Sequence, residues 1–388
     1  EYSRGREQAG EGGASERLGT AERGDGMSEK VRVLVVDDSA LMRKMIPQIL
    51  QRDESIEVVG TAIDGSFALR KIEELKPHVV TLDLDMPRMD GMETLRQITR
   101  AHKLPVIIVS SHSTAGASAT FKALALGAFD FVAKPRDAAQ AQMEEIAAEL
   151  IGKIKVAAHA GMGPIAPEPS AAAGEQKRPP KALPRARAAA TRVVAIGIST
   201  GGPNALQYLL SQLPPDFPGA IVVVQHMPEG FTDMFARRLD ECCAIEVKEA
   251  RSGDMLLAGR ALVCPGNRHM RVKRMPLGDI VVLSDDPRVN GHRPSVDVLF
   301  RSVAQEFGSQ ALALIMTGMG DDGADAMGAV KAAGGMTIAQ SEDSCVVFGM
   351  PKAAIDKGHA VRVVALDALA NTLQVQCGNH ERMSAARM

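Results

Sequence analysis

The chain has 388 residues, with 45 Lys and Arg against 47 Asp and Glu, and a formal net charge of −2. This balance lacks the basic excess that holds a nucleic-acid backbone, so we expect no nucleic-acid partner. The five cysteines lack metal-ligand spacing, and the sequence has neither an apolar run long enough for a membrane helix nor a signal-peptide core. We therefore expect a cytoplasmic protein of two folded domains without direct membrane insertion.

Composition divides the chain into segments. Residues 1–26 carry almost no large apolar side chains, which predicts a disordered extension. Residues 155–190 are rich in Ala and Pro with basic residues, which is typical of a flexible linker. We expect folded domains over residues 27–154 and 191–380, with a tail at 381–388.

The first folded block alternates short apolar runs with helical patterns. The runs include "VRVLVVD", "HVVTLDL", "LPVIIVS" and "DFVAKP". Five such strand and helix units within residues 31–151 predict a five-stranded, doubly wound parallel sheet.

Polar residues follow the strands of this block. They are Asp37 and Asp38 after the first strand, Asp83 after the third, Ser110 at the fourth and Lys134 after the fifth. Ligands bind beyond the carboxyl ends of such strands. Carboxylates that bind Mg²⁺, a nucleophilic aspartate, a lysine and a hydroxyl together indicate aspartyl phosphorylation.

A simpler interpretation competes for each of these residues. Asp37 or Asp38 would cap the following helix, and Lys134 would be a surface charge. The block nevertheless resembles the response-regulator receiver family over almost its whole length. The resemblance implies a flavodoxin-like fold in which Asp83 is phosphorylated, Asp37 and Asp38 hold Mg²⁺ with it, Ser110 is the switch hydroxyl and Lys134 binds phosphate.

The second block has the same alternation. Its predicted strands are "RVVAIGIS", "AIVVVQH", "RALVCPG", "ALALIMTG", "GMTIAQ" and "AVRVVAL". Two further alternating runs flank "PLGD" at residues 276–279 and predict a β-hairpin. We expect a doubly wound, mostly parallel α/β domain with an added hairpin.

The pattern "GISTG" at residues 197–201 places Ser199 between a predicted strand and a predicted helix. This context is that of a nucleophile elbow. Two other roles are open at this point: Ser199 or Thr200 caps the helix, or the glycine-rich turn holds a phosphate.

Two later strands favour catalysis. One ends at His226 and another is followed by the aspartate pair Asp321 and Asp322. A serine nucleophile needs a histidine base and a carboxylate that orients the histidine, and strand ends of one sheet bring such groups together. Backbone N–H groups near residues 318–320 and in the Ser199 turn are candidates for an oxyanion hole.

Four motifs carry a resemblance over nearly all of the chain beyond residue 27. "GISTGGP", "VVVQHMP", "RPSVDVLF" and "IMTGMGDDGA" are similar to signatures of the chemotaxis protein-glutamate methylesterase (CheB) family. The resemblance assigns the triad to Ser199, His226 and Asp322, with Met319 at the oxyanion hole. It implies hydrolysis of glutamate γ-methyl esters and deamidation of glutamines in adaptation.

The resemblance also implies partners and cofactors. The expected substrates are helical cytoplasmic regions of methyl-accepting chemotaxis receptors, and the expected phosphodonor is the chemotaxis histidine kinase. Mg²⁺ is expected for receiver phosphorylation, and no cofactor is expected for the esterase.

Other interpretations stay open. The second domain would be a non-catalytic binding output of a response regulator, or a hydrolase of a small soluble ester. Arg293 and Ser295, at the start of a predicted amphipathic helix, are further candidates to face the substrate.

Overall fold

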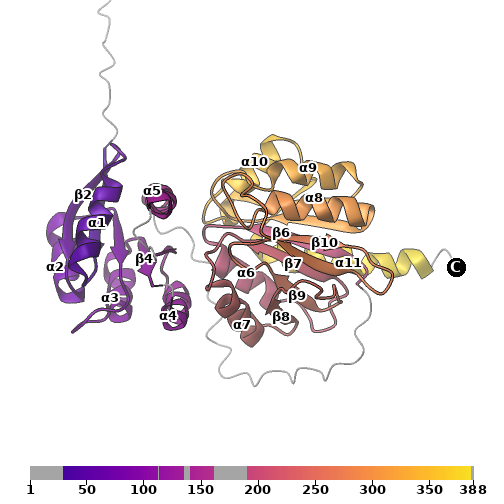
Figure 1. Cartoon of the computed structure of the whole chain (residues 1–388), viewed down its shortest axis with the longest axis horizontal. Helices are drawn as coiled ribbons and strands as arrows, with labels where there is room; N and C mark the ends of the chain where they lie inside the picture. Colours follow the sequence, from indigo (N-terminus) through magenta and orange to yellow (C-terminus); the bar gives the residue numbers. More distant parts are fainter. Residues whose placement is uncertain (1–28, 112, 135–139, 161–189, 386–388) are drawn as a thin grey trace, which may run out of the picture.

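The computed structural model describes residues 29–111, 113–134, 140–160 and 190–385 (Figure 1). The expected extension at 1–26 and most of the expected linker lie outside these residues.

The first domain is a five-stranded parallel sheet in the order β2-β1-β3-β4-β5. Its strands are β1 (Val31–Val36), β2 (Ile56–Ala62), β3 (Val79–Leu82), β4 (Val106–Ser110) and β5 (Asp130–Ala133). Its α-helices are α1 (Ala40–Leu50), α2 (Gly65–Leu75), α3 (Gly91–Gln97), α4 (Thr114–Ala125) and α5 (Gln140–Ala160). This order is that of the flavodoxin-like fold, so the predicted fold of this domain is confirmed.

The second domain is a seven-stranded parallel sheet in the order β14-β13-β12-β6-β7-β9-β8. Its strands are β6 (Val193–Ile198), β7 (Ala220–Gln225), β8 (Glu246–Glu249), β9 (Arg260–Val263), β12 (Ala311–Ile315), β13 (Met336–Gln340) and β14 (Arg362–Val364). The predicted hairpin forms a separate pair, β10 (His269–Lys273) and β11 (Ile280–Ser284). The edge strand β8 was not predicted, because its charged sequence "EVKE" lacks an apolar run.

Helices cover both faces of the second sheet. They are α6 (Gly202–Ser211), α7 (Thr232–Cys242), α8 (Val296–Phe307), α9 (Ala324–Ala332), α10 (Met350–Asp356) and α11 (Leu366–Ala385). In Figure 1, α8, α9 and α10 lie on one face and α6 and α7 on the other. The wholly apolar strand β6 is buried on both sides, as expected for a central parallel strand.

The order of strands reverses between β6 and β12. From β6 the chain proceeds through β7 toward one edge of the sheet, whereas from β12 it proceeds through β13 and β14 toward the other. The loops after two such neighbouring strands diverge to opposite faces and leave a crevice at their carboxyl ends. The crevice between β6 and β12 is therefore the expected place for a site.

Aromatic side chains join the two domains. Phe121 of α4 stacks on Phe235 of α7 with ring centroids 5.4 Å apart, and Phe131 of β5 stacks on Phe231 at 4.9 Å. Asn204 of α6 donates a hydrogen bond to the carbonyl of Leu124. In Figure 1, α4 and α5 lie on the side of the first domain that faces the second. The hydrophobic core is thus continuous across the two domains.

Two element ends differ from the sequence prediction. Helix α5 continues to Ala160, into the expected linker, and α11 continues to Ala385, into the expected tail. Residues such as Ala, Lys, Glu and Arg are good helix formers that also occur in linkers and tails, and here both segments continue the preceding helix. None of the described helices has both the length and the apolar content that a membrane span requires.

A buried lysine ties α5 to β5. Lys153 contacts the carboxylates of Asp130 and Glu149 at 3.3 and 2.7 Å and donates to the carbonyl of Phe131 at 2.6 Å. Removing one partner of such a pair leaves an uncompensated buried charge.

Lys153→Met is therefore expected to lower the free energy of unfolding of the first domain by about 3–5 kcal/mol. The matched control is Lys155→Met, which removes a partly exposed ion pair with Asp53 and is expected to cost less than about 1 kcal/mol. Hydrogen exchange of the β5 amides measures both. Equal loss of protection in the two variants would contradict the prediction.

Candidate functional site

Ser199 lies in a sharp turn between β6 and α6. Gly201 caps α6 with a φ of +73° and no side-chain hydrogen bond, so neither Ser199 nor Thr200 caps this helix and that alternative is wrong. A side chain at Gly201 would be strained by the positive φ, and its Cβ would lie 2.6 Å from Cβ of Val346. The turn leaves Ser199 at the crevice between β6 and β12.

His226 follows the neighbouring strand. Because Ile198 is opposite Gln225 in the parallel register of β6 and β7, the next residues of the two strands, Ser199 and His226, lie at adjoining strand ends. His226 Nε2 lies 2.9 Å from Oδ2 of Asp322, whereas its Nδ1 is buried and has no hydrogen-bond partner among the described residues. Nδ1 is the nitrogen left to accept a proton.

Asp322 is the acceptor at the centre of the site. It is 1% exposed, whereas Asp321 is exposed. At 2.7–3.3 Å it accepts hydrogen bonds from His226 Nε2, Ser295 Oγ, Asn290 Nδ2 and the N–H groups of Val296 and Asp297. Burial alone would raise the pKa of Asp322, but the bonds from His226, Val296 and Ser295 outweigh burial and lower it to about 2. Asp322 is thus an ionised carboxylate.

Met319 and Thr200 offer backbone donors beside Ser199. Hydrogen bonds occupy the N–H groups of Ser199 and Gly318, whereas none is found for Thr200 or Met319 in the described part of the chain. A Cβ on Gly318 would lie 2.8 Å from Ser199 Cβ, which shows how closely this loop approaches the serine. Thr200 and Met319 can therefore stabilise a negative oxygen formed at Ser199.

Two buried residues hold the loops of this site, and the sequence analysis missed both. Gln225 Nε2 donates to the carbonyls of Ser199 and His226. Thr317 accepts the N–H of Ser199 on its carbonyl, and its hydroxyl donates to the Thr200 carbonyl. Gln225 directly precedes His226, and Thr317 directly precedes residues 318–320. A polar residue at the end of an otherwise apolar strand, next to a predicted site residue, is the sequence signal that could have identified both.

Ser295 does not have the role suggested for it, and Arg293 makes hydrogen bonds to neighbouring loops. Ser295 is fully buried and its hydroxyl donates to Asp322, so it supports the carboxylate and does not face substrate. The Arg293 guanidinium donates to Asn267 Oδ1 and to the carbonyl of Asp285, so it holds the loop before α8.

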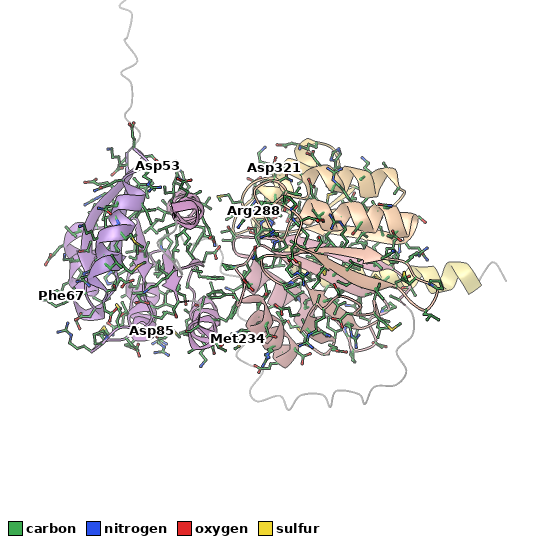
Figure 2. All side chains as sticks on the ribbon, viewed as in Figure 1. Asp53, Phe67, Asp85, Met234, Arg288 and Asp321 are labelled. Atoms are coloured by element: carbon green, nitrogen blue, oxygen red, sulfur yellow. The ribbon has the colours of Figure 1, made fainter. Side chains whose placement is uncertain are left out.

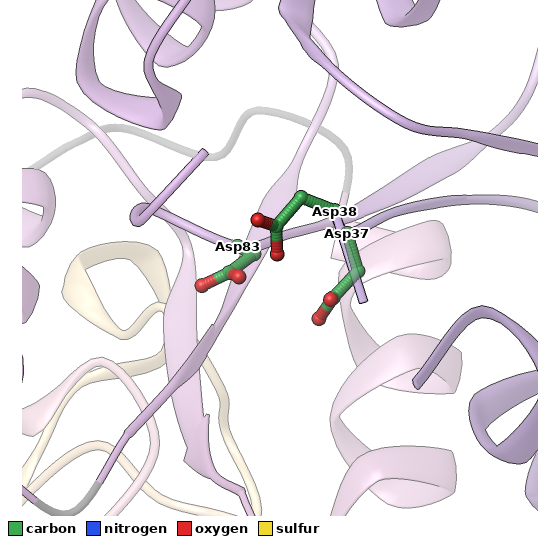
Figure 3. Close-up of side chains that lie close together, drawn as sticks. All are labelled: Asp37, Asp38 and Asp83. Carbon is green, nitrogen blue, oxygen red and sulfur yellow. The ribbon is translucent and has the colours of Figure 1, made fainter. Parts of the chain in front are cut away.

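The predicted polar residues of the first domain also converge. Asp37, Asp38 and Asp83 offer carboxylate oxygens within 4.8 Å of one another (Figure 3). Crowded carboxylate oxygens are the ligands that Mg²⁺ prefers, so this cluster fits the ion.

Lys134 bridges two of these carboxylates, with Nζ 3.0 Å from Asp37 Oδ2 and 2.8 Å from Asp83 Oδ2. Burial raises the pKa of Asp83 despite Lys134, while the two carboxylates raise the pKa of Lys134 despite its burial. The ammonium is therefore held in its charged form, and Lys134 is not a free surface charge. Ser110 lies at the same sheet edge and donates to the carbonyl of Gly116 at 3.2 Å.

Ser39 is the N-cap of α1, because its hydroxyl accepts the N–H of Met42. The alternative in which Asp37 or Asp38 caps this helix is therefore wrong. Asp37 Oδ1 instead accepts the N–H of Ser39, which fixes the start of the loop.

Comparisons with known proteins agree with this geometry. Residues 194–373 match the model of the CheB methylesterase family, and residues 33–145 match the response regulator receiver domain. A protein-glutamate methylesterase/protein-glutamine glutaminase 2 of Koribacter versatilis is 66% identical over 348 residues, which span 89% of this chain and 96% of that protein. The chain belongs to the CheB methylesterase family.

Two further relatives extend this result. A protein-glutamate methylesterase/protein-glutamine glutaminase 5 of Anaeromyxobacter dehalogenans is 48% identical over 91% of this chain and 99% of that protein. The crystal structure of the Thermotoga maritima CheB methylesterase catalytic domain is 39% identical, covers 48% of this chain and 98% of its own, and has a TM-score of 0.47. The two full-length relatives, at 89% and 91% coverage of this chain, span both the receiver and the esterase segments.

Gly318→Ala is expected to lower the esterase kcat by roughly 100-fold, because the new methyl group would displace Ser199 or Met350, and small misplacements of a nucleophile have effects of this size. Circular dichroism is expected to show an intact fold. Gly378→Ala on α11, where a Cβ meets nothing within 4 Å, is the control. Equal rates for the two variants would show that Gly318 does not set the position of the serine.

Proposed function

We propose that this chain is a protein-glutamate methylesterase and protein-glutamine glutaminase whose esterase domain is activated by phosphorylation of its receiver domain. The observation that carries the proposal is the hydrogen bond between His226 and the buried, ionised Asp322, with Ser199 following the strand next to that of His226 in the same sheet. The names of the two relatives described above support the same substrate chemistry.

The first half-reaction is acyl transfer to Ser199. The serine oxygen attacks the γ-carbonyl carbon of a glutamyl methyl ester while its proton passes to Nδ1 of His226. The N–H groups of Thr200 and Met319 stabilise the oxyanion, and ionised Asp322 stabilises the imidazolium. The bond to the methoxy oxygen then breaks, and His226 returns the proton to give methanol.

The second half-reaction uses water. His226 takes a proton from a water molecule, the hydroxide attacks the glutamyl-serine ester, and Ser199 leaves with that proton. The products are glutamate and free enzyme. With a glutamine side chain the leaving group of the first step is ammonia, and the second step is unchanged.

In the receiver domain, Asp83 is the proposed phosphoacceptor. A carboxylate oxygen of Asp83 attacks the phosphorus of a phosphohistidine, and the phosphorus–nitrogen bond breaks. Mg²⁺ bound by Asp37, Asp38 and Asp83 would neutralise the phosphoryl oxygens. Lys134 pairs with the transferred group, and Ser110 is the hydroxyl that responds to it.

Masking is the proposed form of regulation. Gly152 of α5, in the receiver domain, lies close to the catalytic loop, because a Cβ there would lie 2.7 Å from Cε of Met319. Arg288 and Asp321, on loops of the esterase site, lie on the side of that domain that faces the receiver domain (Figure 2). Phosphorylation would shift a two-state equilibrium away from this closed arrangement.

The wider setting follows from the family resemblance. We propose methyl-accepting chemotaxis receptors as substrates, a chemotaxis histidine kinase as phosphodonor and the cytoplasm as the location. We propose a receiver domain from residue 27 to the end of α5 at Ala160, and a catalytic domain from residue 191 to about 380.

Release of methanol from methylated receptor cytoplasmic fragments tests the activity. The wild-type protein is expected to release methanol, faster with a small-molecule phosphodonor and Mg²⁺, and Ser199→Ala is expected to release none. Asp83→Asn keeps the basal rate but loses the stimulation. Phosphorylation of Asp83 without any methanol release would instead favour a non-catalytic output domain, and activity on small esters alone would favour a different hydrolase.

Masking has a separate test. Asn204→Arg places a long charged side chain where Asn204 now donates to Leu124 across the domain interface, so it is expected to raise the unphosphorylated rate severalfold toward the phosphorylated rate. Gln212→Arg, on an exposed residue at the other end of α6, is the control. Removal of residues 27–160 should have the same activating effect. An unchanged or lower unphosphorylated rate in both Asn204→Arg and the deletion variant would rule out masking.

A further inference from the structure

A four-residue turn, Val289 to His292, lies between β11 and α8 against the triad. The N–H of each end residue donates to the carbonyl of the other, at 3.0 and 2.9 Å. The two central residues, Asn290 and Gly291, have φ of 53° and 77°. Positive φ at both central positions is the signature of a type I′ turn, for which Asn-Gly is the preferred sequence. The turn therefore holds its side chains in a fixed direction.

Asn290 directs its amide inward from an otherwise exposed position. Its Nδ2 lies 2.9 Å from Oδ2 of Asp297 and 3.1 Å from Oδ1 of Asp322. The flipped amide would place its oxygen against two carboxylates, so the hydrogen bonds fix its orientation. Asn290 thus connects the triad carboxylate to a second buried carboxylate on α8.

His292 lies on the ring of His226. The ring centroids are 3.9 Å apart and the planes differ by 7°. Burial, and then the neighbouring His226, lower the pKa of His292 to about 4, while Asp322, Asp321 and Arg288 are the other charged groups that face it. The lowered pKa favours a neutral His292 ring, which stacks flat against the imidazole of His226.

We propose that this turn positions the triad: Asn290 sets the orientation of Asp322, and His292 fixes the plane of the His226 ring so that Nδ1 faces Ser199. Both are positioning residues, because each acts through a triad member. The inference rests on the proposed function of the site. It goes beyond the triad because Asn290 adds a side-chain donor to Asp322 besides Ser295 and the backbone of α8, and because the ring of His292 is stacked parallel to that of His226.

The test compares substitutions at the two side chains on the full-length protein. His292→Ala is expected to lower kcat for methanol release by about 10- to 100-fold, with KM changed less than about twofold, since misplacement affects the transition state more than binding. His292→Phe keeps a flat ring and is expected to recover most of the loss. Asn290→Ala is expected to lower kcat similarly, with a smaller effect on stability because Asp322 keeps its four other hydrogen bonds.

The pH dependence of activity distinguishes positioning from a purely structural role of Asn290, because a purely structural role would leave the acidic limb of the pH profile unchanged. Wild-type activity is expected to fall on acidification, because His226 accepts a proton from Ser199 only while it is neutral. Asn290→Asp adds a negative charge beside Asp322, which favours the imidazolium, so the acidic limb is expected to move to higher pH by roughly half a unit or more. Asn371→Asp, an equal charge change on the exposed face of α11, is expected to leave the limb in place.

Labelling of Ser199 by a fluorophosphonate, with the same variants and pH range, separates two kinds of failure. If the wild type is neither labelled nor releases methanol, the proposed function fails. If the wild type does both and the Ala variants match it, the proposed role of the turn fails. An effect on KM alone, or a loss at His292→Ala that Phe does not recover, would assign these residues to substrate contact and overturn the positioning role.

Discussion

The buried carboxylate of Asp322 is the constraint around which the esterase domain is arranged. A buried charge is unfavourable unless it is paired and fully hydrogen-bonded, and Asp322 accepts five hydrogen bonds. Two of them come from the N-terminus of α8, whose unpaired N–H groups and dipole favour an anion. Asp297 in the first turn of α8 in turn accepts the N–H of Ala326 in α9. The two helices thus cap each other through these aspartates, and any shift between α8 and α9 would move Asp322 and the hydrogen bond that it makes with His226.

The sheet supplies the remaining geometry. Parallel register places Ser199 and His226 at adjoining strand ends, and the reversal of strand order between β6 and β12 opens the crevice that Asp322 reaches from the other side. The receiver domain uses the same principle with different chemistry, because its strand ends bring Lys134 to two carboxylates. In both domains, therefore, the site forms where the carboxyl ends of parallel strands bring polar residues together.

The sequence predicted what depends on strand order and residue type. Apolar runs and the polar residues that end them were enough to expect both sheets and to bring Asp37, Asp38 and Asp83 together. The sequence could not predict contacts that depend on loop conformation. His292 lies in a segment without periodicity, and its stacking on His226 follows from a turn whose backbone directs it there. Strand β8 was missed because its pairing with β9 depends on tertiary contacts and not on an apolar run. The predicted end of α5 was too early because alanine-rich sequence occurs both in helices and in linkers.

The phenylalanine stack between the domains has a consequence for solubility. Phe121, Phe231 and Phe235 are almost completely buried, and part of that burial comes from the neighbouring domain. When the domains separate, aromatic faces on both surfaces meet water, and exposed apolar patches of this kind promote association with other proteins. In the proposed masking scheme, the open form would therefore also be the form most prone to self-association, and return to the closed form would protect the protein as well as end the signal.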